Sequence, residues 1–546
     1  MNEFPEWATY TGYPKHGDRW TDLSRKAIER RKQESKNVLA KLKSINRSVL
    51  NERDQLNYDL YKYDLELGVE GDQFADEYLA IDQMEGLQSE VPQLLGMMPA
   101  NNLAQYRDII ARLKSLPVLV EQTIALLKEG AEKGITPPKI TLVNVPDSFE
   151  SLVSEEAFKD PFKSPLLAAF QRFPTNISTK QQATLKEEAA KAMIEKTLPA
   201  LKKLKTFISE TYIPHCRESI GLRDLPNGKA WYAFKTKHYT TTTLTPQKIH
   251  EIGLSEVKRI RDEMDQAIKE ANFNGDFAEF LDFLQSDSRF FYNNAEELVR
   301  GYRDIAKRID QELPRLFGLL PRLPYGVQPV PSHIEKTQPT AYYLPGAANA
   351  GRPGIFYANT YSLKDRPKWE MEALTLHEAV PGHHLQISLT HEMQNVPEFR
   401  KYLQQTAFVE GWGLYAESLG KELGLYKDPY SHFGRLSYEM WRAIRLVVDT
   451  GIHSMGWSRQ QAIDYFKKYA NKSEHDITVE VDRYIVMPGQ ALAYKIGELK
   501  FKELRANAQK RLGEKFDIRA FHDGVLKNGA LPLQILEAEV NKAQRR

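Results

Sequence analysis

One short segment constrains the fold more than any other part of the chain, because it must both form and break a helix. Residues 376–386 read Leu-His-Glu-Ala-Val-Pro-Gly-His-His-Leu-Gln, and apolar side chains recur at helical spacing over 369–380. Pro381 has no backbone N–H to donate to the carbonyl of His377, and Gly382 tolerates almost any backbone angle. We therefore expect a helix that carries His377 and ends at the Pro-Gly pair.

The histidines of this segment are candidate metal ligands. Zinc takes its ligand nitrogens at about 2.0–2.1 Å, so two histidines must converge within a few ångströms. On a straight helix His377 and His384 would lie two turns apart, about 10 Å along the axis, and His383 would point to a different side. A break at Pro381 could bring either of them back toward His377. The alternative is an exposed helix end with a fortuitous histidine cluster.

The bulk composition excludes several classes of partner. The 546 residues include 75 Lys or Arg and 73 Asp or Glu, and a net charge of +2 gives no sign of nucleic-acid binding. No run of about 18 apolar residues is present, so we expect no membrane span. Cys216 is the only cysteine, which excludes an intramolecular disulfide and a thiolate metal cluster.

Helical periodicity dominates the sequence, with charged residues interleaved among leucines. Residues 1–215 are predicted to form a helical scaffold and residues 216–546 the catalytic region, the two forming one intertwined unit. We expect short strands at 230–234, 341–344 and 354–359, the last two joined by a glycine-rich turn. The predicted fold class is mainly α, with a small antiparallel sheet beside the metal-binding helix.

The central segment resembles the bacterial proteins grouped as domain of unknown function (DUF) 885, whose signature reads H-E-x-x-P-G-H-H-x-Q. Further motifs carry the resemblance over nearly the whole chain: Phe4 to Thr9, Thr21 to Ser24, Arg352-Pro353-Gly354 with Asn359, Glu410-Gly411-Trp412, Asp449 to His453, and Arg483-Tyr484 with Met487 to Ala491. The resemblance implies a large helical metallopeptidase-like fold that binds zinc, distantly similar to the thermolysin-like and oligopeptidase groups. It also implies that His383 is the second metal ligand and that His384 is a neighbour in contact with a ligand or substrate.

A second predicted helix supplies a carboxylate. A long helix opens at Pro397, and Glu410 on it is the natural third zinc ligand. Glu417, two turns along the same face, is expected to orient a histidine through its other ring nitrogen. Gly411 and Gly413 cost about 0.5–1 kcal/mol each inside a helix, so close approach of another helix or a ligand is expected there. The alternative is that both glutamates are ordinary surface residues.

A polar stripe follows on a third predicted helix. Arg442, Arg445, Asp449 and His453 fall within about 80° on a helical wheel, and spacing alone favours a solvated face. The resemblance implies instead that Asp449 fixes His453, which donates to the oxyanion of the tetrahedral intermediate. Arg442 then belongs to the surroundings of the site.

The motif that contains Arg483 and Tyr484 offers further substrate contacts. Tyr484 is our first choice for a second oxyanion donor, with Tyr494 as its substitute. Arg483 could bind a substrate carboxylate through two parallel hydrogen bonds. A packed tyrosine with a satisfied hydroxyl is the alternative.

The combined prediction is a zinc-dependent peptidase acting on short peptides. His377, His383 and Glu410 would hold the zinc ion, and Glu378 would take a proton from the zinc-activated water and pass it to the leaving amine. The strand at 354–359 could pair with an extended peptide.

Two other functions compete with this prediction. One is a zinc amidase or esterase acting on a non-peptide acyl compound. The other is a helical binding protein with a structural metal, which is less favoured because a purely structural site has no need of Glu378 beside its first ligand.

The cellular compartment is weakly constrained. The N-terminal residues lack the basic-then-apolar pattern of a signal peptide, although a removed signal would leave no trace. The resemblance implies that export as a lipoprotein is common, so a periplasmic or cell-envelope location is expected if a signal was removed, and a cytoplasmic one otherwise.

Overall fold

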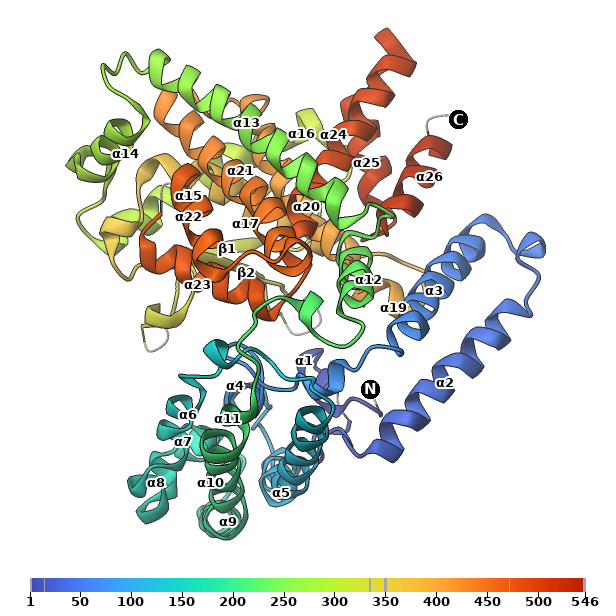
Figure 1. The fold of residues 1–546 in the computed structure, drawn as a ribbon, viewed down its shortest axis with the longest axis vertical. Helices are drawn as coiled ribbons and strands as arrows, with labels where there is room; N and C mark the ends of the chain where they lie inside the picture. The colour runs from blue at the N-terminus through green and yellow to red at the C-terminus, as the bar shows by residue number, and fades with distance from the viewer. Residues whose placement is uncertain (1, 14, 333–334, 348–350, 471, 544–546) are drawn as a thin grey trace. The chain divides into compact units, whose positions relative to one another are not determined.

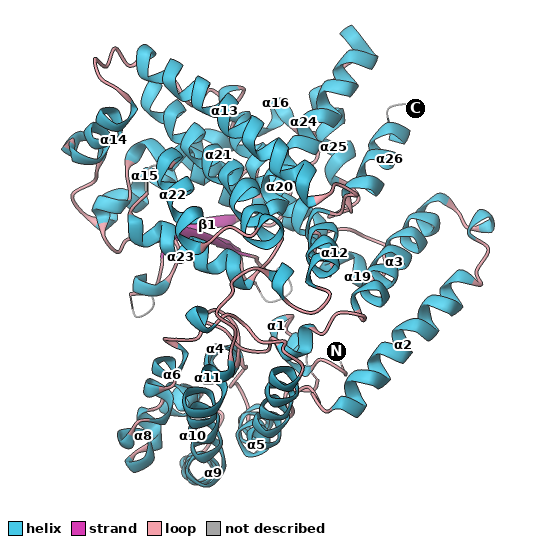
Figure 2. Ribbon diagram, viewed as in Figure 1, coloured by secondary structure: helices cyan, strands magenta, loops and turns pink. Residues whose placement is uncertain are grey.

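The architecture is mainly α-helical with one small sheet, as Figure 1 and Figure 2 show, and the predicted fold class is confirmed in this respect. A computed structural model describes residues 2–13, 15–332, 335–347, 351–470 and 472–543. The chain divides into two compact units, an N-terminal unit of residues 1–45 and 64–228 and a C-terminal unit of residues 46–63 and 229–546. The sequence did not predict that residues 46–63 group with the C-terminal unit.

The N-terminal unit consists of helices around one apolar core. Its helices are α1 (Pro5–Tyr10), α2 (Arg25–Lys43), α4 (Leu87–Met97), α5 (Leu103–Glu132), α6 (Val145–Ser148), α7 (Glu150–Val153), α8 (Glu155–Lys159), α9 (Thr179–Ala192), α10 (Leu198–Thr206) and α11 (Ile213–His215). A capping box between Ser178 and Gln181 starts α9. Within the described residues of this unit, no three side chains gather as a possible metal site.

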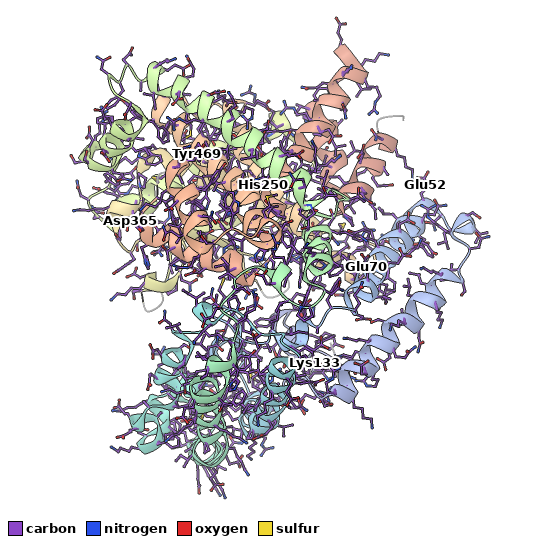
Figure 3. The ribbon with its side chains drawn as sticks, viewed as in Figure 1. Glu52, Glu70, Lys133, His250, Asp365 and Tyr469 are labelled. Carbon is purple, nitrogen blue, oxygen red and sulfur yellow. The ribbon has the colours of Figure 1, made fainter. Side chains whose placement is uncertain are left out.

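The C-terminal unit holds every residue predicted to carry chemistry. Its helices are α3 (Glu52–Gly71), which starts in this unit, α12 (Gly228–Thr240), α13 (Pro246–Glu270), α14 (Phe277–Ser286), α15 (Ala295–Asp310), α16 (Leu313–Leu316), α17 (Met371–Glu378), α18 (His383–His391), α19 (Glu398–Tyr402), α20 (Thr406–Ser418), α21 (Pro429–Thr450), α22 (Arg459–Tyr469), α23 (Glu474–Val486), α24 (Ala493–Leu512), α25 (Ile518–Leu526) and α26 (Leu533–Ala543). Helices α13 and α21 pack along each other, and His250, labelled in Figure 3, lies 2.8 Å from the hydroxyl of Thr450. No helix in the described part of the chain is both long and apolar enough to span a membrane.

The sheet has three strands, β1 (Tyr325–Pro329), β2 (Ala341–Leu344) and β3 (Gly354–Ala358), in the order β1-β3-β2. The predicted strands at 341–344 and 354–359 are confirmed, and the sheet contacts α17 through β2. The prediction of an antiparallel sheet is wrong, because β1 pairs with β3 in parallel and only β2 is antiparallel. The sequence missed β1, an edge strand whose Pro329 stands at its end, where proline is tolerated. The expected turn between β2 and β3 includes residues 348–350, which lie outside the described residues.

The strand predicted at 230–234 is also wrong, since these residues belong to α12. Aromatic side chains there have high β propensity, but the buried positions recur at helical spacing. Trp231, Tyr232, Thr236 and Thr240 are each at most 1% exposed. Burial against the rest of the unit therefore overrides local propensity.

The long helix predicted from Pro397 is two helices. Leu403 and Gln405 adopt extended backbone between α19 and α20. The reason is tertiary, because α19 packs against α18 whereas α20 packs against α17 and α24. The apolar periodicity runs through the break and so does not reveal it.

Candidate metal centre

The helix break at Pro381-Gly382 occurs as predicted. Helix α17 ends at Glu378, and α18 begins at His383. A Cβ atom on Gly382 would lie 2.0 Å from the backbone oxygen of His377, so only glycine fits at this position. The chain therefore folds back on the last turn of α17.

Three side chains converge at this break. The Nε2 atoms of His377 and His383 lie 3.5 Å and 3.6 Å from Oε2 of Glu410, which projects from α20. The three ligand atoms all lie within 4.8 Å of one another. Donors at about 2.0–2.1 Å from a tetrahedral zinc ion are separated by roughly 3.3–3.4 Å. The donor set therefore fits a zinc ion with little movement.

His384 turns away from these donor atoms toward the sheet. Its Nδ1 lies 2.8 Å from the hydroxyl of Tyr343 and 3.3 Å from that of Ser388. Its ring centroid is 4.6 Å from that of Tyr325. A Cβ atom on Gly354 would lie 2.8 Å from the same Nδ1. The geometry thus favours His383 over His384 as the second donor, and His384 joins the sheet to α18.

Glu417 orients the ring of His377 through its Nδ1 atom. Its Nδ1 lies 2.8 Å from Oε1 of Glu417, which is 1% exposed. Donation from Nδ1 to the carboxylate leaves Nε2 free to act as a ligand. A Cβ atom on Gly413 would come within 2.7 Å of the ring, and one on Gly411 would lie 2.4 Å from Cα of Gly497 in α24. The close approaches expected at these two glycines are confirmed, one to the histidine and one to a helix.

The electrostatics suit a cation. Burial lowers the pKa of His383 to about 4, so its imidazole is neutral and can bind a metal. Burial opposes ionisation of Glu410, but its hydrogen bond to His377 and its electrostatic attraction to His383, His377 and Arg442 hold its pKa at about 2. For His377 burial is outweighed by the carboxylates of Glu410 and Glu417, which raise its pKa to about 9. The carboxylates that attract this proton would equally attract a metal ion.

Glu378 follows His377 in the sequence, and its carboxyl group has a pKa suited to proton transfer. Burial and then the charge of Glu410 raise its pKa to about 7, although His377 and Arg442 act in the opposite direction. The backbone N–H of Tyr343 in β2 donates to its carboxylate. A carboxyl with a pKa near neutrality is suited to accept and release a proton.

The predicted pair of Asp449 and His453 is engaged elsewhere. Asp449 accepts hydrogen bonds from the hydroxyl of Tyr232 at 2.6 Å and from the backbone N–H of Gly489 at 3.0 Å. His453 lies in a π-helical turn that continues α21, and its Nε2 is 2.9 Å from the backbone oxygen of Tyr484. Both side chains are fully buried. These contacts give no support to His453 as an oxyanion donor.

The hydroxyl of Tyr484 is satisfied inside the protein. It donates to Glu480 at 2.6 Å and accepts from Arg445 at 3.0 Å and from Trp441 at 3.3 Å. Arg483 is also occupied, because it donates to Gln490 at 2.8 Å and to Glu480 at 3.2 Å. The alternative of a packed tyrosine therefore describes Tyr484.

Tyr494 is the more exposed of the two tyrosines. It is partly exposed, whereas Tyr484 is fully buried, and burial together with the charge of Glu410 raises the pKa of the Tyr494 hydroxyl. Because the hydroxyl of Tyr484 is satisfied inside the protein, Tyr494 is the candidate oxyanion donor of the two.

Comparison with known proteins agrees with the resemblance seen in the sequence. A family model described as "Bacterial protein of unknown function (DUF885)" matches residues 5–540. The chain belongs to this family. A crystal structure from Colwellia psychrerythraea, described as a "putative lipoprotein", is 28% identical with a TM-score of 0.92 and matches over 99% of this chain and 96% of that one. A structure from Shewanella oneidensis, described as a "putative lipoprotein of unknown function", is 18% identical with a TM-score of 0.74 and matches over 98% and 96%. A search among curated proteins gives no match.

Sequence reasoning missed three residues that shape the site of this DUF885 protein. Tyr343 contacts both Glu378 and His384, and no sequence signal links them across so many residues. Glu480 precedes Tyr484 by one helical turn, a spacing that could have indicated the pair. Gly497 lies inside α24, and a glycine within a helix could have indicated a close helix crossing.

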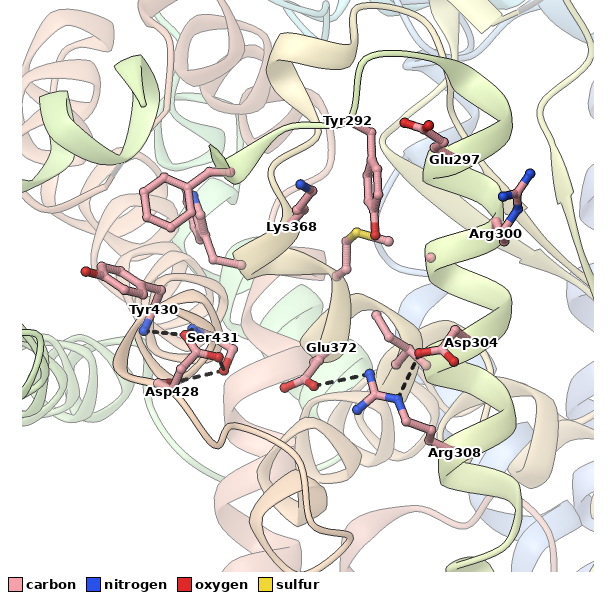
Figure 4. A pocket seen from close by; sticks show the side chains of 15 residues that line it. Tyr292, Glu297, Arg300, Asp304, Arg308, Lys368, Glu372, Asp428, Tyr430 and Ser431 are labelled. Carbon is pink, nitrogen blue, oxygen red and sulfur yellow. Dashed lines mark hydrogen bonds and ion pairs between the residues drawn. The ribbon is translucent and has the colours of Figure 1, made fainter. Parts of the chain in front are cut away.

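A separate cavity of about 570 Å³ lies in the same unit (Figure 4). Three of its charged side chains pair with one another, since Arg308 lies 3.0 Å from Asp304 and 3.7 Å from Glu372. Glu372 stands on α17, so the cavity borders the helix that carries His377. None of the described residues that line the cavity is a metal-donor candidate.

Proposed function

We propose that this DUF885 protein is a zinc-dependent hydrolase that cleaves amide bonds in short peptides. The observation that carries the proposal is the convergence of His377, His383 and Glu410, with ligand atoms within 4.8 Å, and Glu378 directly after the first of them. Two imidazoles and one carboxylate are typical of catalytic zinc sites, which keep a position open for water. A bound zinc ion would lower the pKa of that water and polarise the scissile carbonyl.

The chain supplies the proton transfer. Glu378, whose pKa is raised to about 7, accepts a proton from the attacking water and delivers it to the leaving amine. The backbone N–H of Tyr343 orients its carboxylate. Tyr494 is the side chain that we assign to the oxyanion, in place of His453 and Tyr484.

The peptide would pair with β2 and not with β3. The strand proposed from the sequence, β3, is the central strand and has partners on both sides. Among the described strands β2 pairs only with β3, and the contact of its Tyr343 with Glu378 brings β2 next to the proposed site. An extended peptide added beside β2 would present its backbone to the catalytic carboxylate.

Metal analysis together with Glu378→Gln tests the function. We expect about one zinc ion per chain in both proteins, and a loss of peptide hydrolysis by about 10²- to 10⁴-fold in the variant. A metal-free wild-type protein that still cleaves peptides would contradict the proposal. Turnover of esters or non-peptide amides with no peptide cleaved would favour the acyl-hydrolase alternative, and bound zinc with no turnover of any substrate would favour a binding protein.

We also infer a location in the cell envelope. The support is that the similar structure from Colwellia psychrerythraea is described as a "putative lipoprotein". Fractionation of cells that express the native gene tests this, and recovery in the cytosolic fraction would contradict it.

A further inference from the structure

Two buried arginines lie on α21, and one of them, Arg442, lies 3.7 Å from Glu417, which orients His377. Arg442 and Arg445 are one turn apart, and each is 7% exposed. Their guanidinium carbons lie 5.8 Å and 5.3 Å from the ring centroid of Trp441. Residues three apart on a helix share a face, so both side chains extend to the same side of α21.

Neither arginine uses all of its hydrogen-bond donors. Arg442 donates from Nη1 to the backbone oxygen of Tyr438 at 3.2 Å, and its Nη2 lies 3.7 Å from Glu417. Arg445 donates from Nε to Tyr484 and from Nη2 to Glu480 at 3.2 Å. The Nε of Arg442 and the Nη1 of Arg445 are buried and have no partner. Buried N–H groups without acceptors are costly, which suggests that an acceptor is supplied by a ligand.

The carboxylates that face these arginines are shared with other groups. Oε2 of Glu480 lies 3.2 Å from each of two arginines, Arg445 and Arg483. Glu417, which lies 3.7 Å from Arg442, is also 2.8 Å from the ring of His377. Neither carboxylate satisfies the unpaired N–H groups of Arg442 and Arg445, so these groups are open to an acceptor on a ligand.

Each arginine contacts a residue that we assign to the site. The guanidinium carbon of Arg445 lies 4.6 Å from the ring centroid of Tyr494, the assigned oxyanion donor. The 3.7 Å contact of Arg442 with Glu417 leads to His377. The partly exposed rings of Trp441 and Tyr494 both lie beside the Arg445 guanidinium, which connects it to the protein surface.

We propose that Arg445, with Arg442 beside it, binds the free C-terminal carboxylate of the peptide substrate. A guanidinium binds a carboxylate through two parallel N–H···O bonds. The site would thus cleave peptides near their C-terminus. This inference rests on the proposed hydrolase function and adds the class of substrate. Arg483, which the sequence suggested for the same role, has its donors engaged with Gln490 and Glu480.

Paired substrates test the inference. Zinc-loaded wild-type protein is given peptides that are identical except for a C-terminal carboxylate or carboxamide. We expect kcat/KM to be roughly 10- to 100-fold higher for the acid, and cleavage to fall close to the C-terminus. Equal kcat/KM for acid and amide, or cleavage at internal positions of long peptides regardless of their ends, would overturn it.

A variant and its control locate the carboxylate site. Arg445→Gln should lower the ratio of kcat/KM for the acid to kcat/KM for the amide by a similar factor, toward one. Arg459→Gln removes an arginine paired at 2.6 Å with Asp482 on neighbouring helices, and the preference for the acid should persist. Loss of the preference in the control but not in Arg445→Gln would refute the assignment. If Arg445→Gln does not fold, the inference is tested by the ratio of kcat/KM for acid and amide peptides in Arg442→Gln and in the wild-type protein.

A binding measurement separates this inference from the proposed function. Calorimetric titration of the Glu378→Gln variant with the acid and amide peptides requires no turnover. Preferential binding of the acid, with no hydrolysis by wild-type protein, would reject the hydrolase and retain the carboxylate site. Hydrolysis by wild-type protein with equal binding of both peptides would retain the hydrolase and reject the carboxylate site. Equal binding without hydrolysis would reject both.

Discussion

The ring of His377 shows how much of the site depends on single residues. Glu417 holds one of its nitrogens at 2.8 Å, and Gly413 makes room for the ring on the neighbouring helix. Each constraint acts on a different feature, the first on the tautomer and the second on the position of the ring. Each can therefore be tested separately.

Glu417→Gln keeps the shape of the side chain and removes its charge. We expect the affinity for zinc to fall by about 10- to 100-fold, because the amide is a weaker acceptor for the Nδ1 proton of His377. Competition with a chromogenic chelator measures the change. Glu422→Gln serves as a control, since Glu422 pairs with Arg505 and touches no candidate ligand. Unchanged affinity in Glu417→Gln would contradict the orienting role.

Gly413→Ala should disturb both metal binding and stability. The added methyl would lie 2.7 Å from the ring of His377, which Glu417 prevents from moving away. We expect a loss of about 1–3 kcal/mol in the free energy of unfolding and weaker zinc binding. The control is Gly68→Ala in α3, where a Cβ atom meets nothing within 4 Å, and a neutral or stabilising effect is expected. Similar results for both substitutions would exclude a specific contact.

At the scale of elements, α21 behaves differently from its sequence pattern. The stripe of Arg442, Arg445, Asp449 and His453 was expected on spacing alone to be solvated, but all four side chains are buried. Neighbouring helices cover this face and supply the partners, including Tyr232 from α12 and Tyr484 from α23. The polar stripe of α21 is therefore an interior network, and its charges influence stability.

Asp449 makes this network dependent on pH. Burial raises the pKa of its carboxyl to about 7, although hydrogen bonds from Tyr232 and Gly489 oppose the rise. The unfolded value is about 3.9, so the protonated form is favoured in the folded state. Its contribution to stability is complete below pH about 4 and is lost as the pH rises through about 7.

Asp449→Asn should remove this dependence. We expect the wild type to lose stability relative to the variant between about pH 4 and pH 7, and the difference to become constant above that range. Urea denaturation of both proteins at several pH values measures it. A difference that does not change with pH would show that the Asp449 carboxyl does not titrate in this range.

In the whole molecule, the two units are not two consecutive stretches of the chain. Residues 46–63 belong to the C-terminal unit, and Leu60 is fully buried in the apolar core of that unit. The N-terminal part of the sequence thus contributes to the unit that carries the candidate metal site. Dividing the chain into an N-terminal scaffold and a C-terminal catalytic region omits this contribution of residues 46–63.

Leu60→Ala tests whether residues 46–63 stabilise the C-terminal unit. The cavity left in the core should lower the free energy of unfolding by about 2–5 kcal/mol in the transition that zinc stabilises. Scanning calorimetry with and without zinc identifies that transition. Leu254→Ala, at a leucine 45% exposed, should have little effect. If only a zinc-insensitive transition shifts in Leu60→Ala, Leu60 does not belong to the metal-binding unit.

The sequence by itself determined what depends on residue type over a few positions. Pro381 and Gly382 break the helix because of their own backbone chemistry, and the histidines and Glu410 are candidate metal donors because of their own side chains. Only the tertiary structure decided what depends on distant segments. It selected His383 over His384 and made residues 230–234 helical. The physical reason is that burial and hydrogen-bond partners come from elements far away in the chain, and no local pattern reports which elements will meet.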